Sequence, residues 1–126
     1  MRPIKFRGKD VNTWKWLYGD FVQCNGEKFI SNYNEVGQLT YTKDDIHINK
    51  VIPKTVCQFV MKHKGNDIYE HDLILFCGLL CEVVYDSERC CFCLLYIKQQ
   101  SKVIFSLREV FRLYDYELVG NVFDNL

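Results

Sequence analysis

The sequence lacks an excess of charge of either sign. Sixteen basic residues balance sixteen acidic residues among its 126 residues, so the formal net charge is zero. Averaged over the chain, this removes the general attraction to phosphate that basic proteins gain by releasing counterions from nucleic acid. Any contact with nucleic acid would therefore depend on a local basic surface.

Long apolar segments are missing too. No apolar run approaches the roughly 18 residues that a membrane-spanning helix needs. The first residues, Met1-Arg2-Pro3-Ile4-Lys5, contain no apolar stretch of the kind found in secretion signals. We therefore predict a soluble cytoplasmic protein with no membrane partner, in which the seven cysteines are reduced thiols.

The chain also contains no linker, low-complexity segment or repeat that would divide it. Hydrophobic residues make up 48% and aromatic residues 15% of the sequence. A chain of this length can bury roughly two-thirds of its unfolded surface. We therefore predict a single domain that spans residues 1–126.

Short apolar runs separated by turn residues predict the fold class. Asn25-Gly26, between two apolar segments, is a strong hairpin signal, and Gly78 indicates another hairpin. Ser106 and Glu109 fit a capping box at the start of a short amphipathic helix. The apolar positions of that helix are Leu107, Val110, Phe111 and Tyr114. We predict an all-β fold, a small and mostly antiparallel barrel or sandwich, with this one short helix near the C-terminus.

Weaker patterns predict further elements of this fold. Pro53 is expected to open a single helical or 3₁₀ turn. Gly120 interrupts an apolar strand and indicates a bulge or a close backbone contact. Additional strands are expected at residues 36–42, 46–48, 57–60, 91–97 and 117–123.

The N-terminal segments alternate apolar and basic residues. Residues 4–7 and 13–16 show this period of two and predict a hairpin. The aromatic and aliphatic side chains available for one face of it are Ile4, Phe6, Trp14 and Trp16. If they face the core, the basic side chains are the solvated face of the hairpin. A second interpretation gives the same hairpin a contact surface for nucleic acid, because small β-barrels bind single strands with basic grooves and aromatic stacking residues. The residues of this possible contact are Lys5, Arg7, Lys15, Trp14 and Trp16.

A turn-forming run passes directly into an apolar strand in the middle of the chain. The residues expected to build this turn are Gly65, Asn66, Tyr69, Glu70 and Asp72. We expect Leu73 and Leu75 to fill the core after it. His71 is expected to lie on the turn with its ring in solvent.

Several stretches in this order resemble one family, the YopX-like proteins of bacteriophages and prophages. They are Ile4-Lys5-Phe6-Arg7, Tyr18-Gly19-Asp20, residues 53–59, Ile68-Tyr69-Glu70-His71-Asp72 and residues 117–123. The resemblance implies an all-β fold and a phage or prophage gene in a bacterial host, and it implies no biochemical activity. The family pattern has Glu-Gly-Asp where this chain has Glu70-His71-Asp72, so the position of His71 is one where relatives can adopt a positive φ.

The cysteines leave two interpretations open. Five of them fall within a short span, and thiolates held by turns are ligands that zinc selects. Their spacing does not form a pair of C-x-x-C turns, and buried cysteine acting as a small apolar residue explains the same pattern. These five residues are Cys77, Cys81, Cys90, Cys91 and Cys93.

No catalytic motif accompanies these residues. The three histidines, His47, His63 and His71, lie in no recognisable catalytic signature. The acidic residues that could hold a cation or exchange protons all lie where carboxylates form turns through local hydrogen bonds. They are Asp10, Asp20, Asp67, Glu70 and Asp72.

The sequence therefore favours a non-catalytic phage or prophage accessory protein without a cofactor or metal. We predict that it works by binding, through self-association or through a host or phage protein, since its aromatic residues are sufficient to build an interface. The alternative is a nucleic-acid-binding module that uses the basic and aromatic N-terminal hairpin.

Overall fold

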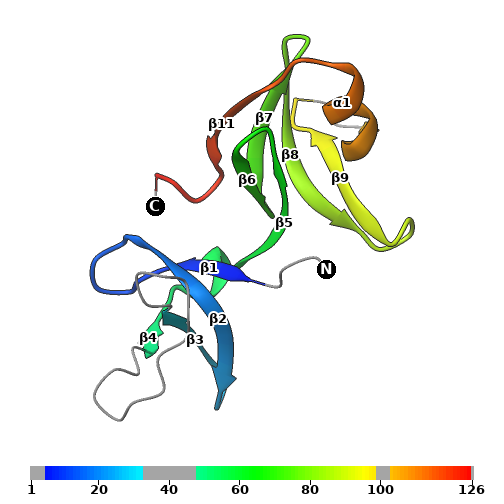
Figure 1. The fold of residues 1–126 in the computed structure, drawn as a ribbon. Coiled ribbons are helices and arrows are strands. Elements are labelled where there is room, and N and C mark those ends of the chain that lie inside the picture. The colour runs from blue at the N-terminus through cyan, green and yellow to red at the C-terminus, as the bar shows by residue number, and fades with distance from the viewer. Residues whose placement is uncertain (1–4, 33–47, 99–102, 126) are drawn as a thin grey trace. The chain divides into compact units, whose positions relative to one another are not determined.

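The computed structural model describes residues 5–32, 48–98 and 103–125. The chain divides into two compact units, unit 1 (Met1–Phe59) and unit 2 (Val60–Leu126), and the division falls within one strand. Each unit is described by itself (Figure 1). The single domain stays a prediction, and the expected strand at residues 36–42, with most of the one at 46–48, lies outside the described residues.

Unit 1 is an antiparallel sheet built from consecutive hairpins. Its strands neighbour each other in the order β4-β3-β2-β1-β5. The elements are β1 (Phe6–Lys9), β2 (Trp16–Cys24), β3 (Glu27–Asn32), β4 (Ile48–Lys50), the 3₁₀ turn η1 (Pro53–Thr55) and the start of β5 (Cys57–His63).

Local turn chemistry explains two of these connections. Asn25 and Gly26 both have positive φ, 52° and 79°, which is the geometry of the tight turn between β2 and β3. The predicted hairpin is therefore confirmed. Pro53 opens the predicted 3₁₀ turn, in which the Thr55 hydroxyl donates to the Ile52 carbonyl at 2.6 Å.

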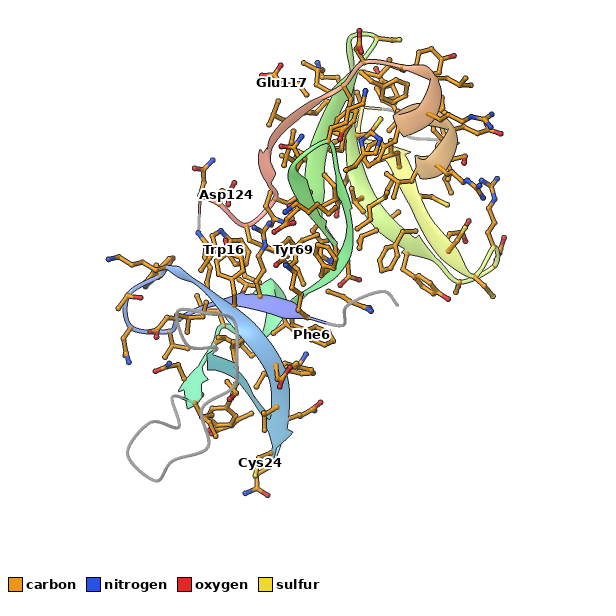
Figure 2. All side chains as sticks on the ribbon, viewed as in Figure 1. Phe6, Trp16, Cys24, Tyr69, Glu117 and Asp124 are labelled. Atoms are coloured by element: carbon orange, nitrogen blue, oxygen red, sulfur yellow. The ribbon has the colours of Figure 1, made fainter. Side chains whose placement is uncertain are left out.

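The N-terminal hairpin differs from the prediction in its strand limits and in its faces. Trp14 lies in the β1–β2 loop, not in a strand. The register pairs Lys9 with Trp16 and Phe6 with Gly19, so Trp16 shares a face with Lys9 while Phe6 lies on the other (Figure 2). The prediction that Phe6, Trp14 and Trp16 can share a face is therefore wrong, because β1 ends two residues later and β2 begins three residues later than expected.

Unit 2 contains a five-stranded antiparallel sheet in the order β10-β9-β8-β7-β11. The elements are the rest of β5, then β6 (Asn66–Tyr69), β7 (Asp72–Phe76), β8 (Leu79–Asp86), β9 (Cys91–Tyr96), β10 (Ile104–Ser106), helix α1 (Leu107–Leu113) and β11 (Glu117–Asn121). The pairing of β11 with β7 shifts register between Leu118 and Gly120, which confirms the predicted bulge.

Tight turns join most of these strands. Cys77 and Gly78 have φ of 50° and 75° and connect β7 to β8, as predicted for Gly78. Lys64 and Gly65 have φ of 49° and 83° and connect β5 to β6. The turn signal at Gly65 thus belongs to this hairpin, and a second turn at Glu70 and His71 leads into β7.

Helix α1 packs against β9 and β10 and completes the core of unit 2. The Ser106 hydroxyl accepts a hydrogen bond from the Glu109 amide at 3.3 Å, which confirms the predicted cap. Tyr114 lies beyond the helix and is exposed. The buried core residues are Val60, Ile68, Ile74, Phe76, Cys81, Val83, Leu94, Leu107, Val110 and Phe111.

Strand β7 turns the opposite face to the core from the one expected. Ile74 and Phe76 are buried, whereas Leu73 and Leu75 are only partly buried. The expectation that Leu73 and Leu75 fill the core is wrong. When every residue of a strand is apolar, the sequence does not reveal which alternate residues face the core. Here the Glu70–His71 turn before the strand determines which residues of β7 point inward.

The described residues form a mostly β structure with antiparallel sheets and one short helix, as the sequence predicts. Within these residues neither sheet closes into a barrel. None of the described helices has the length and apolar character needed to cross a membrane.

Candidate functional site

The loop between β1 and β2 is closed by its own hydrogen bonds. The Asp10 amide donates to the Lys15 carbonyl at 2.9 Å, and the Trp14 amide donates to the Asp10 carbonyl at 3.0 Å. The Asp10 carboxylate accepts from the amides of Asn12, at 2.7 Å, and Thr13, at 3.1 Å. Asp10 therefore performs the turn role predicted for it and holds the loop in one shape.

Trp14 is presented to solvent by this loop in an unusual conformation. Its φ is 63°, in the left-handed region that bulky residues rarely adopt. Its side chain is 51% exposed. Such a backbone conformation costs roughly 1–2 kcal/mol and persists only where the surrounding structure holds it. Here the hydrogen bonds that close the loop hold it.

Cations and aromatic rings alternate on the adjoining face of β1 and β2. The Arg7 guanidinium carbon lies 4.2 Å from the centre of the Trp16 ring, and the Lys9 ammonium lies 5.5 Å from it. Tyr18, opposite Arg7 in the register, is 47% exposed. The structure thus brings Arg7 and Trp16 together.

The other predicted contact residues lie around this pair. Lys15 is exposed in the loop beside Trp14. The Lys5 ammonium lies over the Phe59 ring, 4.3 Å from its centre. Lys9 is almost fully buried, at 4% exposure, so alternating basic residues are not simply the solvated side of this hairpin.

The charges of the chain are divided unevenly between the two units. Residues 1–59 contain nine Lys and Arg but six Asp and Glu, a net charge of +3. Residues 60–126 contain seven and ten, a net charge of −3. The neutral total therefore conceals a basic unit that carries the exposed aromatic loop.

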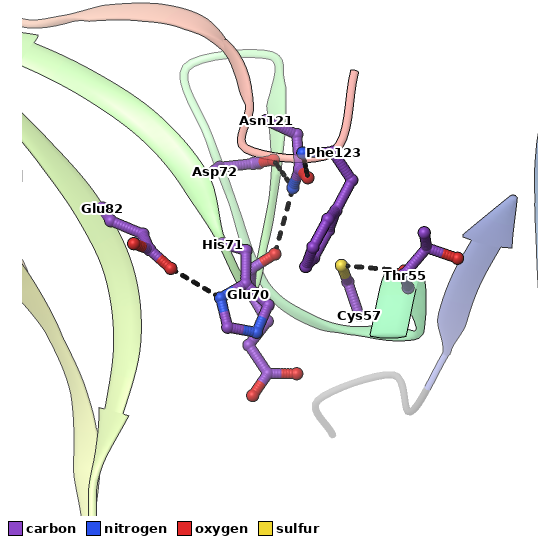
Figure 3. A network of polar contacts seen from close by, with 8 residues as sticks. All are labelled: Thr55, Cys57, Glu70, His71, Asp72, Glu82, Asn121 and Phe123. Carbon is purple, nitrogen blue, oxygen red and sulfur yellow. Dashed lines mark hydrogen bonds and ion pairs between the residues drawn. The ribbon is translucent and has the colours of Figure 1, made fainter. Parts of the chain in front are cut away.

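The predicted central turn lies in unit 2 and contains a polar network (Figure 3). His71 adopts a φ of 68°, its amide donates to the Val83 carbonyl at 2.7 Å, and its carbonyl accepts from the Val122 amide at 3.1 Å. Its Nδ1 lies 2.7 Å from the Glu82 carboxylate. The ring is partly buried, so the expectation of a histidine ring in solvent is wrong.

Asp72 and Asn121 hold the C-terminal segment against this turn. Asp72 is 1% exposed and accepts from the Tyr69 amide at 2.7 Å and from the Asn121 side-chain amide at 2.9 Å. The same Asn121 amide donates to the Glu70 carbonyl at 3.2 Å. The Asn121 backbone amide donates to the Asp124 carboxylate at 2.8 Å. Of the predicted turn residues, Tyr69, Glu70 and Asp72 therefore meet, while Gly65 and Asn66 belong to the preceding hairpin.

Sequence reasoning missed Glu82, Asn121 and Asp124 as parts of this network. Glu82 is separated from His71 by 11 residues and Asn121 from Asp72 by 49 residues. No local pattern connects residues so far apart. Asn121, which follows Gly120, is a polar residue inside an apolar strand. This is the single feature of the sequence that could have indicated the network.

The hydrogen bond that the His71 ring donates to the Glu82 carboxylate raises the pKa of His71 above its ordinary 6.5. Burial of the ring opposes this shift, and the charges of Glu70, Glu82 and Asp72 add to it. The ion pair therefore stabilises the fold fully below about pH 6.5, and its contribution is lost as the pH rises through the raised pKa of the folded state.

Glu82→Gln is expected to reduce stability more in acid than in base. The variant removes the carboxylate that favours protonated His71, so its difference from the wild type should be larger near about pH 5.5 than near about pH 9. Urea unfolding of both proteins at the two pH values measures this. The same difference at both pH values would contradict the role assigned to His71.

The cysteines separate into buried and exposed positions. Cys81 is buried in the core, and its burial raises the pKa of its thiol to about 11. Cys77 and Cys90 are exposed in turns, whereas Cys91 and Cys93 meet on β9. Among the described residues, no three or more His, Cys, Asp and Glu side chains are grouped to hold a metal ion.

Comparison with protein-family models and with curated proteins identifies no relative of this chain. No protein-family model matches the chain, and no curated protein matches it. Any function proposed for the chain therefore depends on its own sequence and on the geometry of its residues.

Proposed function

We propose that the protein is a non-catalytic binding module whose contact surface is the Asp10–Lys15 loop and the adjoining face of β2. The exposed Trp14 on its closed loop carries this proposal. Tryptophan is enriched among the residues that dominate binding energy at interfaces. A residue already held in one backbone conformation loses little further freedom on binding.

Self-association is the form of binding that the charges favour. Because residues 1–59 carry +3 and residues 60–126 carry −3, the basic unit of one copy attracts the acidic unit of another. A two-fold dimer makes this contact twice and leaves no unpaired surface for further growth.

Removal of the Trp14 ring is expected to weaken the dimer by roughly 30-fold or more, the effect of losing an interface residue worth about 2 kcal/mol. Trp14→Gly is the preferred change, because glycine adopts positive φ freely and keeps the loop shape. Trp14→Ala should weaken association to the same extent and be less stable than the glycine variant. Sedimentation equilibrium measures association, and urea unfolding measures stability.

The matched control is Ile48→Ala, which removes another half-exposed apolar side chain, from β4 of unit 1. It should leave association near the wild-type value. A wild-type protein that stays monomeric at high concentration, and that also fails to bind oligonucleotides, would remove the support for a binding module at this loop.

Single-stranded nucleic acid is the second candidate partner, favoured by the stacking of Arg7 on Trp16. Trp16 and Tyr18 lie on one face about 6.7 Å apart, from the rise of a strand, and half-exposed Tyr18 can stack on a base. Loss of a stacking ring weakens such binding by about 1–3 kcal/mol. Labelled DNA and RNA oligonucleotides can be titrated at two salt concentrations with the Tyr18→Ala variant and with Tyr85→Ala as its control. This experiment distinguishes nucleic acid from a second copy of the chain as the partner.

We also propose that the chain is a YopX-like phage or prophage protein that acts in the cytoplasm of a bacterial host. The order and spacing of the five resembling stretches support this proposal. A gene that lies among phage structural or regulatory genes is the expected genomic setting, and a gene remote from any phage or prophage would count against it.

A further inference from the structure

Two cysteines on β9 lie close together although neither belongs to the proposed contact surface. Cys91 and Cys93 are two residues apart on a strand, so their side chains share a face. Their sulfur atoms are 3.7 Å apart. Cys91 is exposed, whereas Cys93 is only 2% exposed.

A shallow hollow with a volume of about 420 Å³ lies on the β8–β9 hairpin, to which both cysteines belong. The register places Cys91 opposite Asp86 and Cys93 opposite Val84, and both of these partners line the hollow. Arg89 lines it as well and lies 3.5 Å from Asp86. Neither cysteine lines the hollow itself, but its polar and charged residues lie next to the exposed Cys91 thiol.

We propose that Cys91 and Cys93 form a reversible oxidation site that reacts with a low-molecular-weight disulfide of the glutathione class. The exposed thiolate of Cys91 attacks one sulfur of the disulfide, and a mixed disulfide forms as one glutathione thiolate leaves. The thiolate of Cys93 then attacks the Cys91 sulfur and expels the second glutathione thiolate. The two protein thiols lose two protons and two electrons, and the small disulfide becomes two thiols.

The order of these steps follows from exposure and proton affinity. Burial and the hydrogen bond with Cys91 raise the pKa of the Cys93 thiol, so it is a poor first nucleophile. Once the mixed disulfide stands on Cys91, the short distance between the two sulfurs gives the second step a high effective concentration.

The geometry of the strand makes the resulting bond easy to reverse. Two residues of strand span about 6.6 Å between Cα atoms, close to the upper limit of about 6.8 Å for disulfides. A bond formed there lies at the edge of this range and includes the exposed sulfur of Cys91, and exposed disulfides are reduced readily. The pair therefore suits a reversible modification better than a permanent crosslink.

Oxidised glutathione with the reduced full-length protein tests the proposal. After acid quenching, peptide mapping by mass spectrometry should find a Cys91–Cys93 disulfide without attached glutathione, and dithiothreitol should restore both thiols. Cys93→Ala should stop at a glutathione adduct on Cys91. Cys91→Ser should leave Cys93 unmodified in the folded protein, which circular dichroism verifies for each variant.

Cys90→Ser is the matched control, because the Cys90 thiol is exposed beside Cys91 but donates to the Ser87 carbonyl at 3.4 Å. This variant should form the Cys91–Cys93 bond at the wild-type rate. A glutathione adduct that persists on wild-type Cys91, or a disulfide between Cys90 and Cys91, would overturn the proposal. Because the cysteine pair lies in unit 2, a negative result in this experiment would not affect the proposal for the Trp14 surface.

Discussion

Ile74→Ala is expected to lower the free energy of unfolding by about 2–5 kcal/mol. Ile74 lies on β7, and its side chain is fully buried in the core of unit 2 among residues that α1 and β8 contribute. Its removal loses the burial of the side chain and leaves a cavity that close-packed neighbours fill only in part. Urea unfolding followed by circular dichroism measures the change, because both tryptophans of the chain lie in unit 1.

Leu75→Ala is the matched comparison, because it removes a similar volume from the next residue of the same strand. Leu75 is only partly buried and faces away from this core, so its loss should cost about 1 kcal/mol. A Leu75 variant as unstable as the Ile74 variant would mean that both faces of β7 are equally packed. That result would contradict the assignment of Ile74 to the inner face and Leu75 to the outer face of the strand.

Asp72→Asn is expected to destabilise the protein by about 2–3 kcal/mol. The two oxygens of the buried carboxylate accept hydrogen bonds from the Tyr69 amide and from the Asn121 side chain. An asparagine keeps the shape but replaces one acceptor by a donor, so one buried N–H loses its partner. Hydrogen bonds to charged groups contribute about 1.5–3 kcal/mol.

The control for Asp72→Asn is Asp115→Asn, which makes the same chemical change at an exposed position. It should change stability by less than about 0.5 kcal/mol. Asn121→Ala should resemble Asp72→Asn, and the double variant should lose less than the sum because the two side chains share one hydrogen bond. Additive losses would show that Asp72 and Asn121 act separately.

The features predicted correctly are those that short stretches of chain encode. Asn25-Gly26 forms its turn because both residues tolerate positive φ, and Ser106 caps α1 through a bond to a residue three positions away. These geometries need no information from distant residues. The hairpins and the helix could therefore be predicted from sequence.

The features predicted wrongly depend on register and on distant partners. The alternation in residues 4–16 suggests a hairpin, but the pairing of Lys9 with Trp16 moves Trp14 into the loop. Gly8 on β1 allows a close approach to Val51, since a Cβ there would lie 3.1 Å from it, and this distant contact is also not visible in the local pattern. The pairing of His71 with Glu82 likewise depends on the strand order of unit 2, which no short segment specifies.

The position of β11 beside β7 gives the end of the chain a protective role. Strand β7 is flanked by β8 on one side and β11 on the other, and its residues Leu73 to Phe76 are all apolar with high strand propensity. Detachment of β11 would leave a row of unpaired backbone groups along this strand, the kind of edge that recruits other chains into intermolecular sheets. The Asp72–Asn121 bond therefore guards against aggregation as well as stabilising a turn.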